Sequence, residues 1–252
     1  MGITEPAGGA NIEDPALEFR TVRTFAKKDG DDYVINGHKL WPGLSGYADH
    51  FTSTHLKGHL GYWVVATTDP TLGADGAGVF YVPADVEGLS FSNPYQKMGF
   101  SWTESNSDIW FNQVHIPKRY RIDTQRGQGA QLINGYIIGL GRLAGAARLV
   151  GLSDAVLEIV LNWSQHRIIA GTPMRERSMF AGMLGEMYRS IDLSRQYYLS
   201  TTWQVTKPDI YGSPWSPGMK AKFSNARSAA ADTAQMVCNR AMELMGAADA
   251  HA

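Results

Sequence analysis

The stretch RTVRTFAKKDGDDYVING, residues 20–37, decides the fold of the first half of the chain. Apolar and polar residues alternate on both sides of Asp29-Gly30-Asp31, and an Asp-Gly turn between two such runs is a strong signal of a β-hairpin. Further short runs rich in β-branched and aromatic residues follow: GYWVVATTD (61–69), GVFYVPAD (78–85) and SDIWFNQVHIP (107–117). Short strands separated by Gly, Pro and Asp predict an antiparallel barrel or sandwich.

The sequence takes on a helical period near residue 125. Between Gly129 and about Ser164, apolar residues recur at spacings of three, four and seven, which predicts a long amphipathic helix. A second helix is expected over residues 175–205. The stretch KPDIYGSPWSPG (207–218) then breaks the pattern with three prolines and two glycines.

Signals for both ends of a third helix follow this break. Ser216 can cap the first turn, Pro217 suits its first position, and Gly246 is a typical C-terminal cap. We therefore expect an α+β protein in two segregated domains. A β-domain, built as an antiparallel barrel or sandwich, is expected over residues 1–125, and an antiparallel helical bundle over residues 126–252.

The composition is that of an ordinary globular protein. With 252 residues, 44% of them hydrophobic and 19% charged, the chain can bury one large core or two moderate ones. A net charge of -1 and a pI near 6.7 give no broad attraction to nucleic acid or anionic lipid, and we expect no nucleic-acid partner. The single Cys238 cannot form an intrachain disulfide, and neither a signal peptide nor a membrane-spanning run is evident. A cytoplasmic location is expected, unless a targeting segment was lost with the natural N-terminus.

Several common sites find no support in the sequence. The seven histidines show no metal-ligand spacing and one cysteine cannot build a thiolate zinc site, so we expect no metal. The stretch GLGRLA (139–144) resembles a dinucleotide-binding turn, but it lies inside a helical pattern and is a poor candidate.

Two turns can present backbone N–H groups to a ligand, one in TEPAGGA (4–10) and one in WPGLSG (41–46). Trp41 lies at the mouth of the expected sheet, where a tryptophan is more often rim packing than a binding group. The alternative is that its indole stacks on a planar cofactor held between the two turns.

Two arginines allow the same pair of interpretations. Arg167 follows the first long helix, where an arginine commonly satisfies the last carbonyls and the helix dipole, although its guanidinium also suits a phosphate. Arg142 falls among apolar and small residues of a helix that should be mostly buried. Its charge must therefore meet a carboxylate, backbone carbonyls or a ligand.

Taken in order, these motifs resemble the acyl-CoA dehydrogenase family over essentially the whole chain. The match to the family's middle β-domain is carried by ITEPAGGAN (3–11), DGDDYVINGHKLW (29–41), YADH (47–50), GVFYVPAD (78–85), KMGF (97–100) and FNQVHIPK (111–118). The match to its C-terminal helical region is carried by GRLAGAARLVGLSDAVLEIV (141–160), RIIAGTPM (167–174), MLGEM (183–187) and MELMGA (242–247). The resemblance implies FAD as cofactor, and a longer protein whose N-terminal helical domain is absent from this chain.

The resemblance also implies which residues meet the flavin. Ile3 and Thr4 would line it, with the Thr4 hydroxyl bonded to the isoalloxazine, and Trp41 would pack against the ring. Gly43 replaces a common threonine near flavin N5, so only its backbone N–H can serve. Ser178 falls where a flavin-contacting glutamine is common.

By the same resemblance, Arg167 would reach the FAD pyrophosphate of a neighbouring subunit, and Arg142 would lie close to the acyl-CoA. Ala10, in place of the serine of a usual Ser-Asp pair, is assigned with Arg142 to the substrate site. Further departures from the family's pattern are Asn11, Ser101-Trp102 and Ala170.

In the family, a glutamate removes the α-proton of the acyl thioester while the β-hydrogen leaves as hydride to flavin N5. That glutamate lies beyond the third helix in most members and just before the helix arginine in others, where this chain has Gly141. Neither position supplies a base here, so no catalytic residue is assigned. The family's usual electron acceptor is an electron-transfer flavoprotein.

Three functions stay open. The first is an acyl-CoA dehydrogenase whose base comes from sequence not shown, the second a flavin-dependent monooxygenase of the same fold, and the third a non-catalytic FAD-binding partner subunit. We expect a homo- or hetero-oligomer with FAD near its interface, because the third helix presents a small-residue face: Ala226, Ala229, Ala230, Thr233, Val237 and Ala241.

Overall fold

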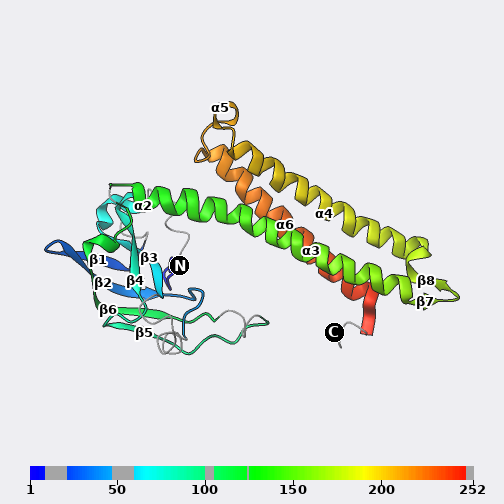
Figure 1. Ribbon diagram of the computed structural model, residues 1–252, viewed down its shortest axis with the longest axis horizontal. Helices are drawn as coiled ribbons and strands as arrows, with labels where there is room; N and C mark the ends of the chain where they lie inside the picture. The colour runs from blue at the N-terminus through cyan, green and yellow to red at the C-terminus, as the bar shows by residue number, and fades with distance from the viewer. Residues whose placement is uncertain (9–21, 47–59, 100–104, 124, 248–252) are drawn as a thin grey trace. The chain divides into compact units, whose positions relative to one another are not determined.

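A computed structural model describes residues 1–8, 22–46, 60–99, 105–123 and 125–247. The chain forms two compact units, Met1–Asn134 and Gly135–Ala252 (Figure 1). The first unit is built on β-strands and the second on helices. The expected fold class, with its two kinds of structure segregated along the chain, is confirmed.

A six-stranded half-barrel sheet forms the first unit, in the order β4-β3-β1-β2-β6-β5. Neighbouring strands are antiparallel as expected, with one exception: β1 and β3 are parallel, through Phe25 and Thr67. They are parallel because the chain leaves β2 and returns on the opposite side of β1, a crossover that the local sequence does not specify. The strands are β1 Phe25–Asp29, β2 Asp32–Lys39, β3 Gly61–Thr67, β4 Ala77–Pro83, β5 Leu89–Phe91 and β6 Ile109–Ile116.

The predicted hairpin joins β1 to β2. Asp29 pairs with Asp32 across a two-residue loop in which Gly30 takes a φ of +60°. The pairing of β2 with β6 shifts register between Ile35 and Gly37. Glycine is required at position 37, because a Cβ there would lie 2.6 Å from the Thr24 hydroxyl.

One face of the sheet supplies the core of this unit. Its fully buried side chains come from every strand except β5, whose partly buried Leu89 and Phe91 pack against this core. The most deeply buried members are Ala26, Ile35, Val64, Ala66, Phe80, Val82, Ile109, Val114 and Ile116.

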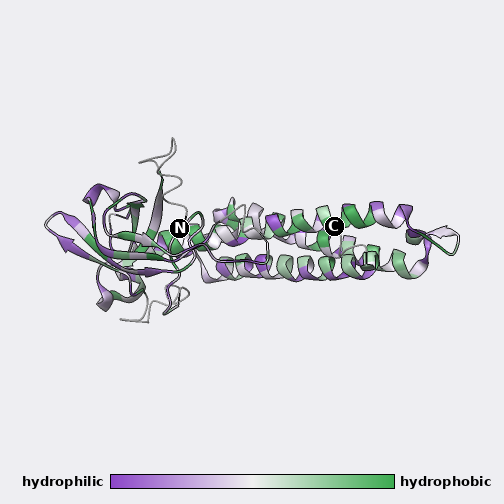
Figure 2. Ribbon diagram, turned by 90° about the horizontal axis from the view of Figure 1, so that it is seen from below, coloured by the Kyte–Doolittle hydropathy of each residue, from purple (hydrophilic) through white to green (hydrophobic). Residues whose placement is uncertain are grey.

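Three long helices form the second unit, and hydrophobic residues recur along them among hydrophilic ones (Figure 2). They are α3 Gly141–His166, α4 Ser178–Val205 and α6 Pro217–Met245. A short hairpin of β7 Ile168–Ile169 and β8 Thr172–Pro173 connects α3 to α4. The common core of the three helices includes Leu143, Ala146, Val150, Val160, Met187, Ile191, Phe223 and Val237.

The first long helix differs from the expectation at its start. It begins as a short α2, Gln128–Gln131, widens to a π-helix over Leu132–Leu140 and continues as α3. Within the helical unit Gly135 lies against the Trp215 ring, where a Cβ would come within 2.7 Å of it. Tyr136 packs on the same indole, with ring centroids 4.4 Å apart. The apolar periodicity does not reveal this widened segment.

The predicted caps of the third helix are confirmed. The Ser216 hydroxyl accepts a hydrogen bond from the Met219 backbone N–H at 3.3 Å, and Gly246 ends α6 with a φ of +60°. The stretch expected as a simple break also holds one helical turn, α5 Pro208–Tyr211, which begins on its proline.

The small-residue face of α6 is used inside the chain. Five of its six members are buried in the helical unit, and the Thr233 and Ser194 hydroxyls share a hydrogen bond of 2.7 Å between α6 and α4. Ala229 alone of the six is exposed. This face is packed within the chain, so it does not support the predicted oligomer. Within the described ranges, no helix is long and apolar enough to cross a membrane.

Candidate functional site

The N-terminal turn of the β-unit lies between β3 and the end of β2. The Gly2 N–H donates to the Trp63 carbonyl at 2.7 Å, and the Val65 N–H donates to the Gly2 carbonyl at 3.0 Å. Two residues on, the carbonyl of Thr4 accepts the N–H of Leu40 at 2.9 Å. This last bond ties the first predicted turn to the residue just before Trp41.

A buried ion pair lies beneath this turn. The Lys39 ammonium is 2.7 Å from the Glu5 carboxylate, and their side chains are 0% and 3% exposed. Burial lowers the pKa of Lys39 to about 8, although the Glu5 charge and hydrogen bond oppose the shift. Burial would raise the pKa of Glu5, but the charge and hydrogen bond of Lys39 and the hydrogen bonds from Arg23 and Thr24 hold it below 4.5.

Trp41 projects from the end of β2 with half of its surface exposed, 51%. Its backbone takes a φ of +41°, a left-handed conformation that costs free energy for any residue with a Cβ. The Asn106 carboxamide donates to the Trp41 carbonyl at 2.9 Å, and the Tyr95 ring lies edge-on to the indole with centroids 6.4 Å apart. The indole is thus held in place while one side of it stays open.

Gly43 is held by pairing of its segment with residues 105–107. It forms an isolated antiparallel bridge to Asn106, and the next residue, Leu44, donates its N–H to Ser105 at 2.8 Å. The buried Ser45 hydroxyl donates to the Pro42 carbonyl at 2.6 Å. The second predicted turn therefore has a defined backbone.

Both turns carry hydrogen-bond donors that have no partner among the described residues. In the described part of the chain, the backbone N–H groups of Ile3, Thr4 and Gly43 make no hydrogen bond, and neither does the Thr4 hydroxyl. Ile3, Thr4 and Gly43 are all half-buried. Half-buried donors without partners are costly unless water or a ligand accepts from them, so they fit the polar edge of a planar ligand stacked on Trp41.

A polar and aromatic cluster adjoins Trp41 through Tyr95. The Tyr95 hydroxyl donates to Asp108 at 2.7 Å, and this hydrogen bond raises the pKa of the phenol. The other Asp108 oxygen lies 3.3 Å from His38 Nε2, and the His38 ring stacks on Trp110 at 4.8 Å. The cluster supports Tyr95 and, through it, the indole of Trp41.

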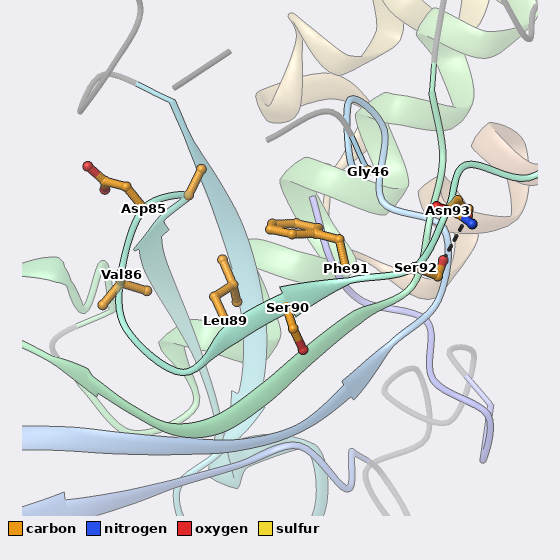
Figure 3. Close-up of a pocket in the computed structure, with 9 residues that line it drawn as sticks. Gly46, Asp85, Val86, Leu89, Ser90, Phe91, Ser92 and Asn93 are labelled. Carbon is orange, nitrogen blue, oxygen red and sulfur yellow. Dashed lines mark hydrogen bonds between the residues drawn. The ribbon is translucent and has the colours of Figure 1, made fainter. Parts of the chain in front are cut away.

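A pocket of about 470 Å³ lies between Gly46 and the β4–β5 connection (Figure 3). Polar side chains of Asp85, Ser90, Ser92 and Asn93 share its lining with apolar side chains of Val86, Leu89 and Phe91, and the Ser92 hydroxyl donates to the Asn93 carbonyl at 3.0 Å. Its lining residues are Gly46, Ala84, Asp85, Val86, Leu89, Ser90, Phe91, Ser92 and Asn93.

The remaining predicted site residues of the described chain lie in the helical unit. Arg167 is exposed, and within the part of this unit that the structure describes its guanidinium has no hydrogen-bond or ion-pair partner. The carbonyls beyond α3 are instead bound by Arg177, whose Nε donates to Ile169 at 3.0 Å. Ser178 is exposed at the start of α4, and Arg142 is half-buried in the first turn of α3.

The structure does not describe every residue that the sequence predicted, and some residues near the candidate site were not predicted. Ala10, Asn11 and Ser101-Trp102 lie outside the described residues. Glu5, Lys39 and Arg177 were not predicted as site residues. Lys39 left a signal, because strand alternation places it on the same face as buried Ile35, where an ammonium group needs a carboxylate. Among the described residues, no three His, Cys, Asp or Glu side chains gather to hold a metal ion.

Two sequence models of the acyl-CoA dehydrogenase family match the chain, the middle domain over residues 1–114 and the C-terminal domain over residues 127–250. The chain is 26% identical to a probable acyl-CoA dehydrogenase, YngJ, of Bacillus subtilis, covering 98% of this chain and 57% of the relative. It is 27% identical to cyclohex-1-ene-1-carbonyl-CoA dehydrogenase of Syntrophus aciditrophicus, covering 98% and 53%. Butyryl-CoA dehydrogenase from Megasphaera elsdenii has the same fold, with a TM-score of 0.78 at 23% identity over 98% of this chain and 57% of that one. This chain spans about half the length of the curated relatives it matches.

Proposed function

This chain belongs to the acyl-CoA dehydrogenase family, and we propose that it forms the flavin-binding part of an FAD-dependent enzyme that dehydrogenates an acyl-CoA thioester at its α,β-bond. The observation that carries the proposal is the slot in the β-unit. Donors of Ile3, Thr4 and Gly43 have no partner among the described residues, and the half-exposed indole of Trp41 is held by its backbone and by Tyr95.

These residues fit a flavin in their chemistry. The indole of Trp41 offers a flat apolar surface to the ring, and the free N–H groups and Thr4 hydroxyl donate to its oxygen and nitrogen atoms. The bound FAD would supply the acceptor for a hydride leaving the substrate β-carbon. The chain's own contribution is to bind and orient that acceptor with groups that are already in place.

Two residues of the helical unit are also assigned to FAD, on the family resemblance. The Arg167 guanidinium, exposed and without a partner in the described part of its unit, is assigned to the FAD pyrophosphate of a neighbouring subunit. Ser178, with its exposed side chain at the start of α4, is assigned to the flavin. The assignment of Arg167 requires an oligomer.

The buried α6 face does not support an oligomer, but exposed apolar side chains of α4 do: Tyr188, Leu193, Leu199 and Trp203.

Arg142 and Ala10 are proposed to lie at the acyl-CoA. No catalytic base is assigned, because Gly141 has no carboxylate and the Glu5 carboxylate at the slot is already bound by Lys39 and by the backbone N–H groups of Arg23 and Thr24. An electron-transfer flavoprotein is the proposed acceptor of the electrons. The free thiol of Cys238 agrees with a reducing, cytoplasmic compartment, which we also propose.

The lack of a carboxylate at position 141 favours a second candidate. A flavin-dependent monooxygenase of this fold would keep the same flavin slot but take its electrons from an external reductase. A non-catalytic FAD-binding subunit would keep the slot and complete a partner's site.

Anaerobic titration of the flavin-loaded protein with a panel of acyl-CoAs tests the proposal. Loss of the oxidised flavin absorption band with one or more acyl-CoAs is the expected result. A band that no acyl-CoA bleaches, but that a reductase with NAD(P)H does, would replace the dehydrogenase with the monooxygenase. Bleaching that begins only when a partner chain is added would identify the non-catalytic subunit.

A further inference from the structure

We propose that the buried Glu5–Lys39 pair is a positioning element, which fixes the spacing between the Thr4 side and the Trp41 side of the flavin slot. The inference rests on the proposed function for its ligand, but its structural part can be tested without FAD. Glu5 directly follows Thr4, and Lys39 precedes Trp41 by two residues. The pair thus joins the two short segments that carry the donors and the indole.

The Glu5 carboxylate accepts hydrogen bonds from three groups on two segments. One oxygen accepts the Arg23 N–H at 2.7 Å, and the other accepts the Thr24 N–H at 2.8 Å and the Lys39 ammonium at 2.7 Å. These bonds fasten the turn both to the residues that lead into β1 and to the last residue of β2. A turn held from two sides has little freedom to slide along the sheet.

Lys39 holds the turn at a second point. Its ammonium also donates to the Ile3 carbonyl at 3.0 Å, so one cation binds the backbone before Thr4 and the side chain after it. The chain passes closely over the lysine stem at Gly2, where a Cβ would lie 3.2 Å from Lys39 Cγ. The backbone hydrogen bond from Leu40 to Thr4 joins the sequence neighbours of the ion pair, because Leu40 follows Lys39 and Thr4 precedes Glu5.

Stability alone does not account for charges at this place. A buried ion pair is often no more stabilising than a well-packed apolar pair of the same volume. An apolar pair would, however, leave the Ile3 carbonyl and the N–H groups of Arg23 and Thr24 without partners. The pair therefore specifies where the backbone of the turn lies, which is what a preorganised binding site needs.

The test compares two double variants of the full chain. Glu5→Gln with Lys39→Met removes both charges at similar size, so that no buried charge is left unpaired. The matched control, Arg121→Met with Asp123→Asn, removes a second ion pair of the β-unit, whose Asp123 also accepts the Val79 N–H of β4 at 2.7 Å. Hydrogen exchange of the Leu40 amide reports on the turn without FAD, and the FAD dissociation constant reports on the slot.

In the Glu5→Gln/Lys39→Met variant, we expect Leu40 exchange to be faster and FAD binding weaker, each by about tenfold relative to the control. Exchange at Leu40 that matches the control would overturn the positioning role, and so would faster exchange with unchanged FAD affinity. Failure of the unaltered protein to bind FAD would refute the proposed function instead, while the Leu40 amide still decides whether the pair holds the turn. If the double variant does not fold, Glu5→Asp keeps the charge but shortens its reach, and the same two measurements and criteria apply to it.

Discussion

Asn106 donates a hydrogen bond to the backbone carbonyl of Trp41 at 2.9 Å, and so joins the end of β2 to the segment that leads into β6. The bond holds a tryptophan whose φ of +41° is otherwise unfavourable. The position of the indole therefore depends on the surrounding structure, because the backbone of Trp41 would not favour this conformation by itself.

Replacing Asn106 should loosen the indole without removing it. For Asn106→Ala we expect FAD affinity to fall about fivefold, the equivalent of one net hydrogen bond of about 1 kcal/mol. Fluorescence titration with FAD measures this. Asn112→Ala, at an exposed position of β6, is the matched control and should bind as the unaltered protein does. Equal affinities for the two variants would show that the bond to Trp41 has no part in binding.

Removing the indole itself should have a larger effect. For Trp41→Ala we expect FAD affinity to fall more than about tenfold, because stacking and apolar contact are both lost. The thermal midpoint should change little, since half of the side chain is already exposed. Trp63→Ala on β3 removes an indole that is 48% exposed and should keep its flavin. Similar losses in both variants would contradict the placement of the slot at Trp41.

Two arginines near the β7–β8 hairpin should separate binding from stability. Arg167→Ala is expected to weaken FAD binding at unchanged stability, because the guanidinium has no partner in the described part of its own unit. Arg177→Ala is expected to lower the free energy of unfolding by about 1–2 kcal/mol, because the Ile169 carbonyl loses its charged donor. Urea unfolding and FAD titration of both variants measure the two effects. If Arg167→Ala lowers the free energy of unfolding and Arg177→Ala weakens FAD binding, Arg167 is the structural residue.

The Glu5–Lys39 pair should make the free energy of unfolding depend on pH in two intervals, one for each group. The folded-state pKa of Lys39, about 8, lies below its ordinary value of 10.5, so the unfolded state binds more protons between these values and stability should rise across that interval. The pKa of Glu5 is lowered from 4.5, so its contribution is present above pH 4.5 and is lost as the pH falls through the lower folded value.

Urea unfolding across both pH intervals checks this dependence. The difference in stability between the unaltered protein and Glu5→Gln/Lys39→Met isolates these two groups from the rest of the chain. A difference that stays constant from about pH 3 to about pH 11, an interval that includes the ordinary pKa values of both groups, would contradict the ionisation assigned to the pair.

Local signals in the sequence were enough for part of the fold. The loop between Asp29 and Asp32 and the caps at Ser216 and Gly246 depend on residues a few positions apart, and all were predicted correctly. The parallel pairing of β1 with β3 and the π-helix against Trp215 depend on partners far along the chain. Such contacts cannot be read from periodicity.

The candidate site shows the same division. The motifs and the family resemblance predicted Trp41 and the first turn as parts of the site, and that stays a prediction. Glu5 and Lys39 were missed because strand alternation places Lys39 on the buried face but does not identify its partner, which lies 34 positions away in the sequence. The small-residue face of α6 led to the prediction of an oligomer for a related reason. Such a face predicts close helix packing, but it does not show whether the partner helix is in the same chain.

Equilibrium binding of FAD to the purified protein is the simplest test of whether the slot at Trp41 holds a flavin. We expect a yellow protein with about one FAD per chain at saturation, and loss of that binding in Trp41→Ala but not in Trp63→Ala. A folded protein that stays colourless in excess FAD would contradict it.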